Sequence, residues 1–457
     1  MKVKSGSRRR FLKTGAALGL TAGLARPSYG QALHPDVINV TETRARGLLS
    51  KFEKSERIRF RQSNNPNATA LTPLQDLNGI ITPSELHFVV DHENGVLLDI
   101  NPEDYRLQIT GMVDKPLEFT LADLKRMPSV SSINVLTCGS NGSDAFRKGA
   151  QTVQQTHGRT STSEWSGVSF KSLLEEAGVH KDAKWVIAMA ADPSDHVSSF
   201  PMEKAMDGVT MAAYAQNGES LRIDQGYPVR VVAPGYTGRW LVKWLTQLYV
   251  TDDTYVTRQD GFNMTDRMPD GRGYLLASEQ SRYFRLETTA RSVITFPSGG
   301  HQLPGPGYYE IRGLAWTGGI VKRVEISVDG GETWRDAKLQ NPVLPYCHTR
   351  FRMDWEWDGQ ERIIQSRCTD EKGYVQPTPD EVASTWGVDS SPECFNIMGE
   401  YCNQVPRDTH NSFIMSWKIA ANGEVTNPMQ ELYPDGRPEG LSHYYSGGHA
   451  FFEEDDH

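Results

Sequence analysis

The chain has 457 residues, of which 38% are hydrophobic and 23% are charged, and its formal net charge is −9. This composition excludes an intrinsically disordered chain and a protein built of membrane-spanning helices. A single hydrophobic core stops growing at about 250–300 residues, so the length predicts at least two domains. The negative charge argues against nucleic acid as the main partner, because phosphate binding needs clustered lysine and arginine.

The first 32 residues have the features of an export signal. They contain seven basic residues and no acidic residue, and residues 7–13 match the twin-arginine motif. An apolar stretch from Thr14 to Ala25 follows, and small residues near Gly30 and Ala32 provide a cleavage site. The stretch has about 12 residues, which is short of the roughly 20 that span a bilayer. The sequence therefore predicts export to the periplasm by the twin-arginine pathway, with no membrane span.

Two regions with different element patterns follow the predicted signal. Residues 33–75 are polar and are predicted to form an N-terminal arm. From Thr82 to about Val250, strands and helices alternate. The predicted strands cover residues 105–112, 185–189 and 227–232. One predicted helix begins at Thr120, and a second covers residues 170–177 and is closed by Gly178.

Beyond about residue 287 the pattern changes to short strands separated by glycine-containing turns. These strands are predicted over residues 292–296, 308–312, 321–328 and 363–367. Short strands separated by turns in this way are typical of a β-sandwich. The domain boundary is expected between residues 270 and 287, and the acidic tail over 433–457 is expected to be disordered.

The chain has five cysteines, an odd number that leaves at least one unpaired in an oxidising compartment. Cys347 and Cys368 flank a predicted hairpin of strands 351–357 and 361–367. The register of that hairpin puts the two sulfurs too far apart for a disulfide. Cys394 and Cys402 lie in a loop-like stretch and could form a disulfide, which the sequence leaves open.

Cys138 differs from the other cysteines in its surroundings. It ends the apolar run over residues 133–137 and enters the small, flexible turn over residues 139–143. A thiol at the end of a buried strand that leads into such a turn can face a bulky ligand that approaches the backbone. The alternative is an ordinary small core residue.

Several blocks occur in the order that is typical of one enzyme family. They are residues 82–88 with His92, Cys138 with Asn141, residues 164–168, residues 224–230, Pro234 with Gly235, residues 242–245, and residues 312–316, 318–319 and 324–334. Over nearly the whole length after the signal, the chain resembles the sulfite oxidase family of molybdenum-pterin enzymes.

The resemblance implies an α+β fold class. A mixed α/β molybdopterin-binding catalytic domain with the sulfite-oxidase fold is expected over residues 76–285, followed by an Ig-like β-sandwich dimerisation domain over residues 286–432. The implied cofactor is molybdenum-molybdopterin, with Cys138 as the metal ligand and catalytic residue, and a homodimer is expected through the second domain. The other implied cofactor-binding residues are His87, Phe88, His92, Asn141, Asp192, Gln225, Arg230, Leu241, Val242 and Lys243.

The chemistry of these residues suits that cofactor. Soft sulfur ligands suit molybdenum, and one protein thiolate is enough beside the two sulfurs of the pterin. Arg230 is suited to a bidentate contact with the pterin phosphate, and Lys243 to a point contact. A structural ion pair is the alternative role for Arg230.

Within the family, the chain is most similar to the SoxC-like branch, the molybdenum subunits of bacterial sulfane dehydrogenases. Residues 213–219, 349–352, 373–378 and 411–413, together with Gln225, carry this similarity. Typical sulfite oxidases surround the substrate oxyanion with arginines, whereas this chain has Val90, Ser143 and Trp240. Either Arg147, Arg159 and Arg239 replace them, or free sulfite is not the main substrate.

The expected function is therefore a periplasmic oxidoreductase that oxidises reduced sulfur with oxygen from water. A c-type cytochrome is the expected electron acceptor, because the chain has no haem-attachment motif, and a sulfur-carrier protein is a possible further partner. Three alternatives stay open: a direct sulfite dehydrogenase, an S-oxide reductase, and a cofactor-free binding protein that keeps the fold.

Overall fold

The computed structural model describes residues 50, 52–59, 69–90, 97–146, 149–191, 196–255, 265–266, 283–284, 286–381 and 412–430. The predicted signal and tail, Cys394 and Cys402 lie outside these residues, so the predictions about them are untested. No helix within the described ranges is long and apolar enough to cross a membrane. All elements below belong to the unit that begins at Ser55.

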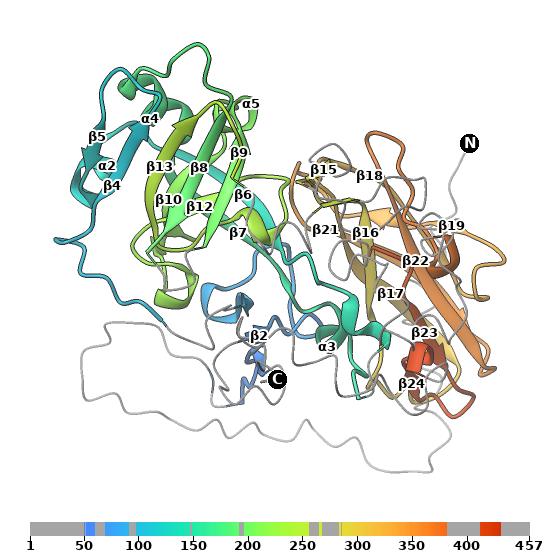
Figure 1. Cartoon of the computed structure of the whole chain (residues 1–457). Helices are drawn as coiled ribbons and strands as arrows, with labels where there is room; N and C mark the ends of the chain where they lie inside the picture. The colour runs from blue at the N-terminus through green and yellow to red at the C-terminus, as the bar shows by residue number, and fades with distance from the viewer. Residues whose placement is uncertain are drawn as a thin grey trace, which may run out of the picture. The chain divides into compact units, whose positions relative to one another are not determined.

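One five-stranded sheet has the order β5-β4-β13-β8-β9 (Figure 1). Its strands are β4 (Leu107–Gly111), β5 (Leu117–Phe119), β8 (Trp185–Ala190), β9 (Val197–Pro201) and β13 (Leu245–Thr251). β13 runs parallel to β4, and the other neighbours are antiparallel. The strands predicted over 105–112 and 185–189 are confirmed as β4 and β8.

A second sheet carries the strands that lead to the candidate site. Its order is β11-β10-β7-β6, with β12 also paired to β10. The strands are β6 (Val130–Thr137), β7 (Thr160–Ser169), β10 (Met211–Gln216), β11 (Glu219–Ser220) and β12 (Arg230–Val232). The strand predicted over 227–232 begins only at Arg230, because Pro228 has no N–H to donate to a ladder.

Two helices of this region begin where the sequence predicts, and the second also ends there. In α2 (Leu121–Arg126), the Thr120 hydroxyl accepts a hydrogen bond from the Asp123 amide at 3.1 Å, which closes a capping box. In α4 (Phe170–Ala177), Gly178 ends the helix in the left-handed region at a φ of 72°. The remaining helices are α3 (Val153–His157), α5 (Met202–Ala205) and the 3-10 turns η1 (Ser84–Leu86), η2 (Ser143–Phe146), η3 (Ile223–Gln225), η4 (Gly238–Trp240) and η6 (Pro428–Gln430).

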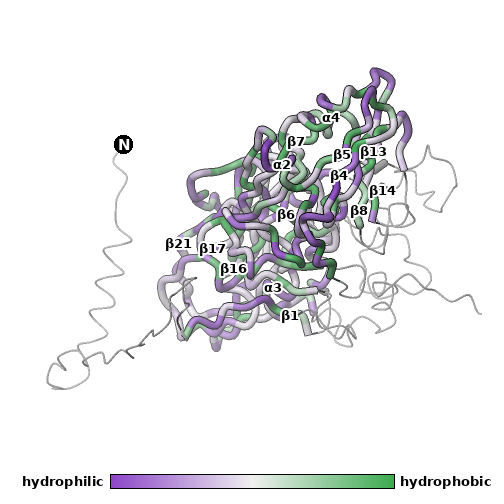
Figure 2. Tube along the Cα trace, turned by 90° about the vertical axis from the view of Figure 1, so that its left-hand side faces the viewer, coloured by the Kyte–Doolittle hydropathy of each residue, from purple (hydrophilic) through white to green (hydrophobic). Residues whose placement is uncertain are grey.

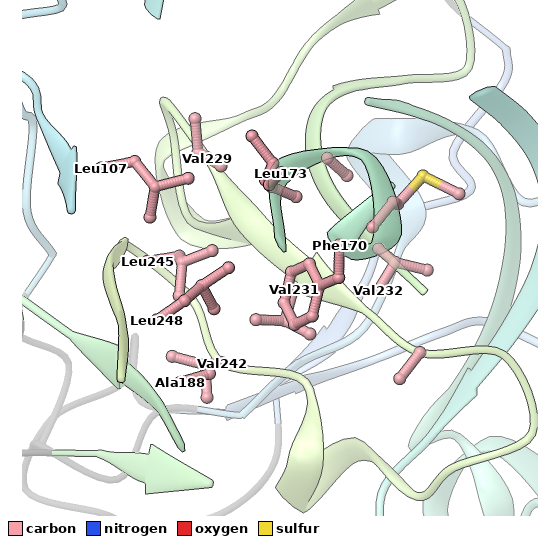
Figure 3. Close-up of a cluster of buried hydrophobic side chains, with 14 of the residues drawn as sticks. Leu107, Phe170, Leu173, Ala188, Val229, Val231, Val232, Val242, Leu245 and Leu248 are labelled. Atoms are coloured by element: carbon pink, nitrogen blue, oxygen red, sulfur yellow. The ribbon is translucent and has the colours of Figure 1, made fainter. Parts of the chain in front are cut away.

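Side chains from both sheets and α4 fill one core. Figure 3 shows Leu107 of β4, Ala188 of β8 and Leu248 of β13 in a cluster with Phe170 of α4 and Val231 of β12. Full burial of a side chain such as Leu or Phe contributes about 1.5–3 kcal/mol. This core therefore fixes how β12, which carries Arg230, lies against the first sheet.

Two antiparallel sheets form the second region, in the order β16-β17-β21-β20 and β19-β18-β22-β23-β24 (Figure 1). The strands are β16 (Arg291–Phe296), β17 (Gly307–Trp316), β18 (Val321–Ser327), β19 (Arg335–Asp336), β20 (Lys338–Leu339), β21 (Thr349–Trp357), β22 (Arg362–Asp370), β23 (Ser416–Ile419) and β24 (Val425–Thr426). Buried and exposed residues alternate along β21 from Phe351 onward, and Figure 2 colours them by hydropathy. The predicted short strands of a sandwich are confirmed.

The predicted hairpin of residues 351–357 and 361–367 is wrong. β21 pairs with β17 and β20, whereas β22 pairs with β18 and β23, so the turn at Asp358 and Gly359 carries the chain from one sheet to the other. Both strands have an inward apolar face, and alternation alone does not tell which sheet a strand joins. Cys347 and Cys368 are both free thiols, as predicted, although not for the predicted reason.

The core of the sandwich also takes in residues from the first region. Leu74, Val135, Ala145 and Val153 belong to the same buried cluster as the inward side chains of both sandwich sheets. Two small sheets complete the described elements, β1 (Ile58–Arg59) with β2 (Thr69–Leu71) and β3 (Val89–Val90), and β14 (Thr265–Asp266) with β15 (Tyr283–Phe284). The two regions are thus packed together through shared apolar side chains.

Candidate functional site

Cys138 lies in a tight loop directly after β6. Its amide donates to Arg159 O at 3.0 Å, and its own carbonyl accepts from the Asn141 amide at 3.0 Å. Its Sγ is 3.2 Å from Ser140 Oγ, and the residue is only partly buried. The loop therefore holds a thiol that a bound group can reach.

Arg159 holds this loop in place. Its guanidinium forms an ion pair with Asp144 at 2.9 Å and donates to Ser140 O at 3.1 Å, while its amide donates to Asn141 Oδ1 at 3.0 Å. Gly238 of η4 lies against the loop from another side, because a Cβ there would be 3.3 Å from the Cα of Cys138. The loop is rigidly supported on both sides.

His87 and Gln225 meet at the backbone of Phe88. His87 Nδ1 is 3.0 Å from Phe88 O, and Gln225 Nε2 donates to the same oxygen at 3.0 Å. The other ring nitrogen of His87, Nε2, is buried and has no hydrogen-bond partner among the described residues. Burial lowers the pKa of His87 to about 3, so the imidazole is neutral at physiological pH.

Arg230 is buried among neutral acceptors. Its Nη1 donates to Gln225 Oε1 at 3.0 Å and to Gln225 O at 3.2 Å, and its Nη2 donates to Leu241 O at 3.2 Å. Within the described residues it forms no ion pair with a carboxylate, and burial lowers its pKa to about 9 while Asp224 opposes this shift. A buried cation whose described partners are neutral favours a bound anion over a structural ion pair.

Lys243 lies near Arg230 and is held by backbone groups. Its Nζ donates to Val90 O and Asp224 O, both at 3.4 Å, and lies 4.6 Å from the centre of the Trp244 ring. Gly226 permits this approach, because a Cβ there would be 2.8 Å from Lys243 Cβ. Leu241 and Val242, which precede Lys243, are buried.

The beginning of β7 lies between the Cys138 loop and the His87 group. Thr160 pairs with Thr137 in the β6–β7 ladder, and Ser161 Oγ accepts from the Phe88 amide at 3.1 Å. The structure thus brings together Cys138, Asn141, His87, Phe88, Gln225, Arg230, Leu241, Val242 and Lys243. His92 and Asp192 lie outside the described residues, so their predicted roles are untested.

Trp165 of β7 belongs to this site, and the sequence analysis did not assign it there. Its ring lies 5.1 Å from the Arg230 guanidinium and 5.7 Å from the His87 ring. Its Nε1 is buried without a hydrogen-bond partner among the described residues. Its position within residues 164–168, one of the blocks that carry the family resemblance, is the sequence feature that could have identified it.

The positions expected to differ from typical sulfite oxidases bring no positive charge near Cys138. Trp240 is fully buried in the first core, Val90 belongs to β3, and Ser143 begins η2. Of the arginines proposed to replace the missing ones, Arg159 is engaged with Asp144. Arg239 is buried and donates to Val197 O and Ser198 Oγ at 3.1 Å, and Arg147 lies outside the described residues.

Family comparisons identify both regions of the chain. A family model described as "Oxidoreductase molybdopterin binding domain" matches residues 93–258, and one described as "Mo-co oxidoreductase dimerisation domain" matches residues 282–395. The chain is 31% identical over 399 residues to nitrate reductase [NADH] 2 of Phaseolus vulgaris, covering 79% of this chain and 43% of that protein. It is 30% identical over 382 residues to nitrate reductase [NADH] of Solanum lycopersicum, covering 74% and 41%. The chain therefore spans about two fifths of the length of these relatives.

A solved structure matches over a greater share of both chains. The sulfane dehydrogenase SoxCD from Paracoccus pantotrophus contains a chain that is 36% identical, with a TM-score of 0.76, covering 89% of this chain and 99% of that chain. The match includes the mixed α/β region and the β-rich region, so the predicted fold class is confirmed. The cofactor that these comparisons indicate is molybdenum-molybdopterin. The chain belongs to the sulfite oxidase family of molybdopterin oxidoreductases.

Proposed function

We propose that this protein is a periplasmic oxidoreductase that oxidises sulfane sulfur carried by a partner protein and passes the electrons to a c-type cytochrome. The observation that carries the proposal is the likeness to the SoxCD chain, which extends over 89% of this chain at 36% identity. The twin-arginine match in residues 7–13 supports the periplasmic location.

The buried polar groups fit a molybdopterin. His87 Nε2, Asn141 Nδ2 and Trp165 Nε1 are buried without partners among the described residues, so each can hydrogen-bond to a polar ring system. Arg230 and Lys243 supply the charge for its phosphate. Cys138 would supply the protein sulfur, and His87, Phe88, Asn141, Gln225, Leu241 and Val242 would line the pterin. When bound, the cofactor supplies a metal that exchanges oxygen with water and accepts two electrons.

The residues of this chain determine how the group and the substrate are held. Cys138 presents its thiol at the partly open end of β6, where it would hold the metal as a thiolate. His87 stays neutral because of its burial, and Nδ1 carries the ring proton because it faces the Phe88 carbonyl. Its Nε2 can therefore accept one hydrogen bond from the bound group without adding charge. Arg230 keeps its charge at neutral pH and holds the anionic end of the group.

The absence of an arginine at positions 90, 143 and 240 supports a carrier-bound substrate over free sulfite. A hydrogen bond between an arginine and an oxyanion contributes about 1.5–3 kcal/mol. Val90, Ser143 and Trp240 make no such contact, and Arg159 is already paired with Asp144. A substrate tethered to a protein binds through the carrier surface and depends less on these contacts.

Two partners follow from the proposal. The formal charge of −9 becomes more negative when the basic signal is removed, and an acidic surface accelerates encounter with a basic cytochrome in a salt-dependent way. The match of residues 282–395 to a dimerisation domain supports a homodimer, which sedimentation of the purified protein would measure.

The test is a comparison of substrates with purified protein from a host that makes molybdopterin. We expect one molybdenum per chain, and reduction of cytochrome c with a sulfane-loaded carrier protein but little with free sulfite. Fast turnover at micromolar sulfite would instead identify a direct sulfite dehydrogenase. Oxidation of reduced dye by an S-oxide or by nitrate would identify a reductase, and nitrate is included because the curated relatives are nitrate reductases.

Substitution of the proposed metal ligand gives the matching control. Cys138→Ser should abolish turnover because a hydroxyl does not replace the soft thiolate, while the fold is kept. Cys368→Ser removes a thiol of the second region as a comparison and should leave turnover within about twofold. A fully active Cys138→Ser enzyme would contradict the assignment of the ligand.

A further inference from the structure

His348, directly before β21, ends a chain of buried side chains that leads to Cys138. Its Nε2 is 2.9 Å from Thr160 Oγ1, and Thr160 Oγ1 is 2.5 Å from Thr137 Oγ1. Thr137 is the last residue of β6 and precedes Cys138. The three side chains belong to residues that are at most 3% exposed, so these bonds are shielded from bulk solvent.

The chain of hydrogen bonds reaches the last residue pair of the β6–β7 ladder before Cys138. Thr137 and Thr160 face each other in the antiparallel β6–β7 pair. The next backbone bond along the chain joins the Cys138 amide to Arg159 O at 3.0 Å. A shift of either threonine therefore moves the residue that carries the sulfur.

A second residue from the sandwich holds the other end of the same loop. Arg291 of β16 donates from Nη1 to Asn141 O at 2.7 Å, in a buried position. The His348 amide donates to Thr162 Oγ1 at 3.2 Å, and two residues before it the Tyr346 carbonyl accepts from the Val135 amide at 2.6 Å. Residues of the β-rich region thus contact the Cys138 loop and its strands at several points.

We propose that His348 is a positioning residue, which acts through Thr160 and Thr137 to fix the direction in which Cys138 presents its sulfur. The proposal rests on the proposed role of Cys138 as the metal ligand. It makes the β-rich region part of the metal site in addition to its family role in pairing subunits. A neutral imidazole has one donor and one acceptor nitrogen, so it can order both hydroxyls into a single arrangement.

Because the hydrogen bonds from His348 through Thr160 to Thr137 are buried, a change at His348 should alter the position of the Cys138 loop. Loss of the imidazole would leave the buried Thr160 hydroxyl one partner short, and the pair would rearrange to satisfy it. Leucine at 348 removes the partner, whereas glutamine places an amide near the position of Nε2 and can replace it. Valine at 160 removes the hydroxyl and keeps the shape of the side chain.

The test uses the metal-loaded enzyme and reads the sulfur–metal bond directly. We expect His348→Leu and Thr160→Val to shift the visible sulfur-to-metal absorption and to lower kcat about tenfold, with KM unchanged within about twofold. The double variant should be no worse than either single one, because the two side chains act in one chain. His348→Gln should restore most of the band and of kcat.

Arg352→Gln is the matched control, because Arg352 is on β21 but exposed and bonded to Gln340. The proposal is overturned if His348→Leu or Thr160→Val lowers only the unfolding temperature while the band and kcat stay those of the wild type. Thr160→Val keeps the test decisive if His348→Leu does not fold. Because the absorption needs no substrate, a loaded wild-type enzyme that oxidises no sulfur compound contradicts the proposed function without affecting this result.

Discussion

At Arg230 the protein buries a positive charge against carbonyl and amide oxygens, with Trp165 beneath the guanidinium. Such a charge is costly unless an anion completes the site. The sequence could name Arg230 only through the family resemblance, because an arginine beside a strand is as often part of an ion pair. Trp165 was missed because an inward aromatic residue on a strand is usually core, and its unpartnered Nε1 is visible only in three dimensions.

Removal of this charge should prevent retention of the cofactor. A bidentate contact with phosphate comprises two charge-assisted hydrogen bonds of about 1.5–3 kcal/mol each, so Arg230→Met should lower the pterin and molybdenum content at least tenfold. Arg230→Lys should keep part of it. Metal analysis and pterin fluorescence measure the content, with the exposed Arg106→Met as control. A folded Arg230→Met protein with full metal content would show that the anion binds elsewhere.

The elements differ in how much of them a sequence can predict. The start of α2 and both ends of α4 were predicted because caps are local: Thr120 with Asp123, and Gly178 in the left-handed region. β21 and β22 were predicted as strands but assigned to one hairpin, because the alternation of each strand gives its inward face and not its sheet. The contact of His348 with Thr160 joins positions 188 residues apart, and no motif marks it.

The capping box of α2 gives a test at this scale. Thr120→Ala removes the acceptor of the Asp123 amide and should lower the free energy of unfolding by about 1 kcal/mol. Thr120→Ser keeps the hydroxyl and should restore most of it. Urea denaturation followed by tryptophan fluorescence measures the difference. Equal stability of the alanine and serine variants would mean that the cap contributes nothing.

Across the whole molecule, several histidines are buried in neutral form. Burial lowers the pKa of His157 to about 3, with Arg291 acting in the same direction, and burial likewise lowers the pKa of His348 to about 3. In the unfolded chain the value is near 6.5. Below that pH the unfolded state binds protons that the folded state cannot, so stability falls as the pH falls.

The size of this effect can be stated. Between pH 7 and pH 5 each histidine should remove about 2 kcal/mol from the free energy of unfolding, or about 6 kcal/mol for His87, His157 and His348 together. Urea unfolding at both pH values measures the change, and the His157→Gln variant should keep about two thirds of it. A protein equally stable at pH 5 and pH 7 would contradict the neutral, buried state of these side chains.

The shared core has a consequence for the order in which the protein can mature. Leu74, Val135, Ala145 and Val153 are covered by a sandwich whose last members include Val425 and Met429. A ribosome releases the chain from its N-terminus, so Val135 and Ala145, on either side of Cys138, emerge about three hundred residues before Val425 and Met429. The core that these residues share with the sandwich can therefore form only after nearly the whole chain has been synthesised, so the strand and the turn that flank Cys138 reach their final packing after translation.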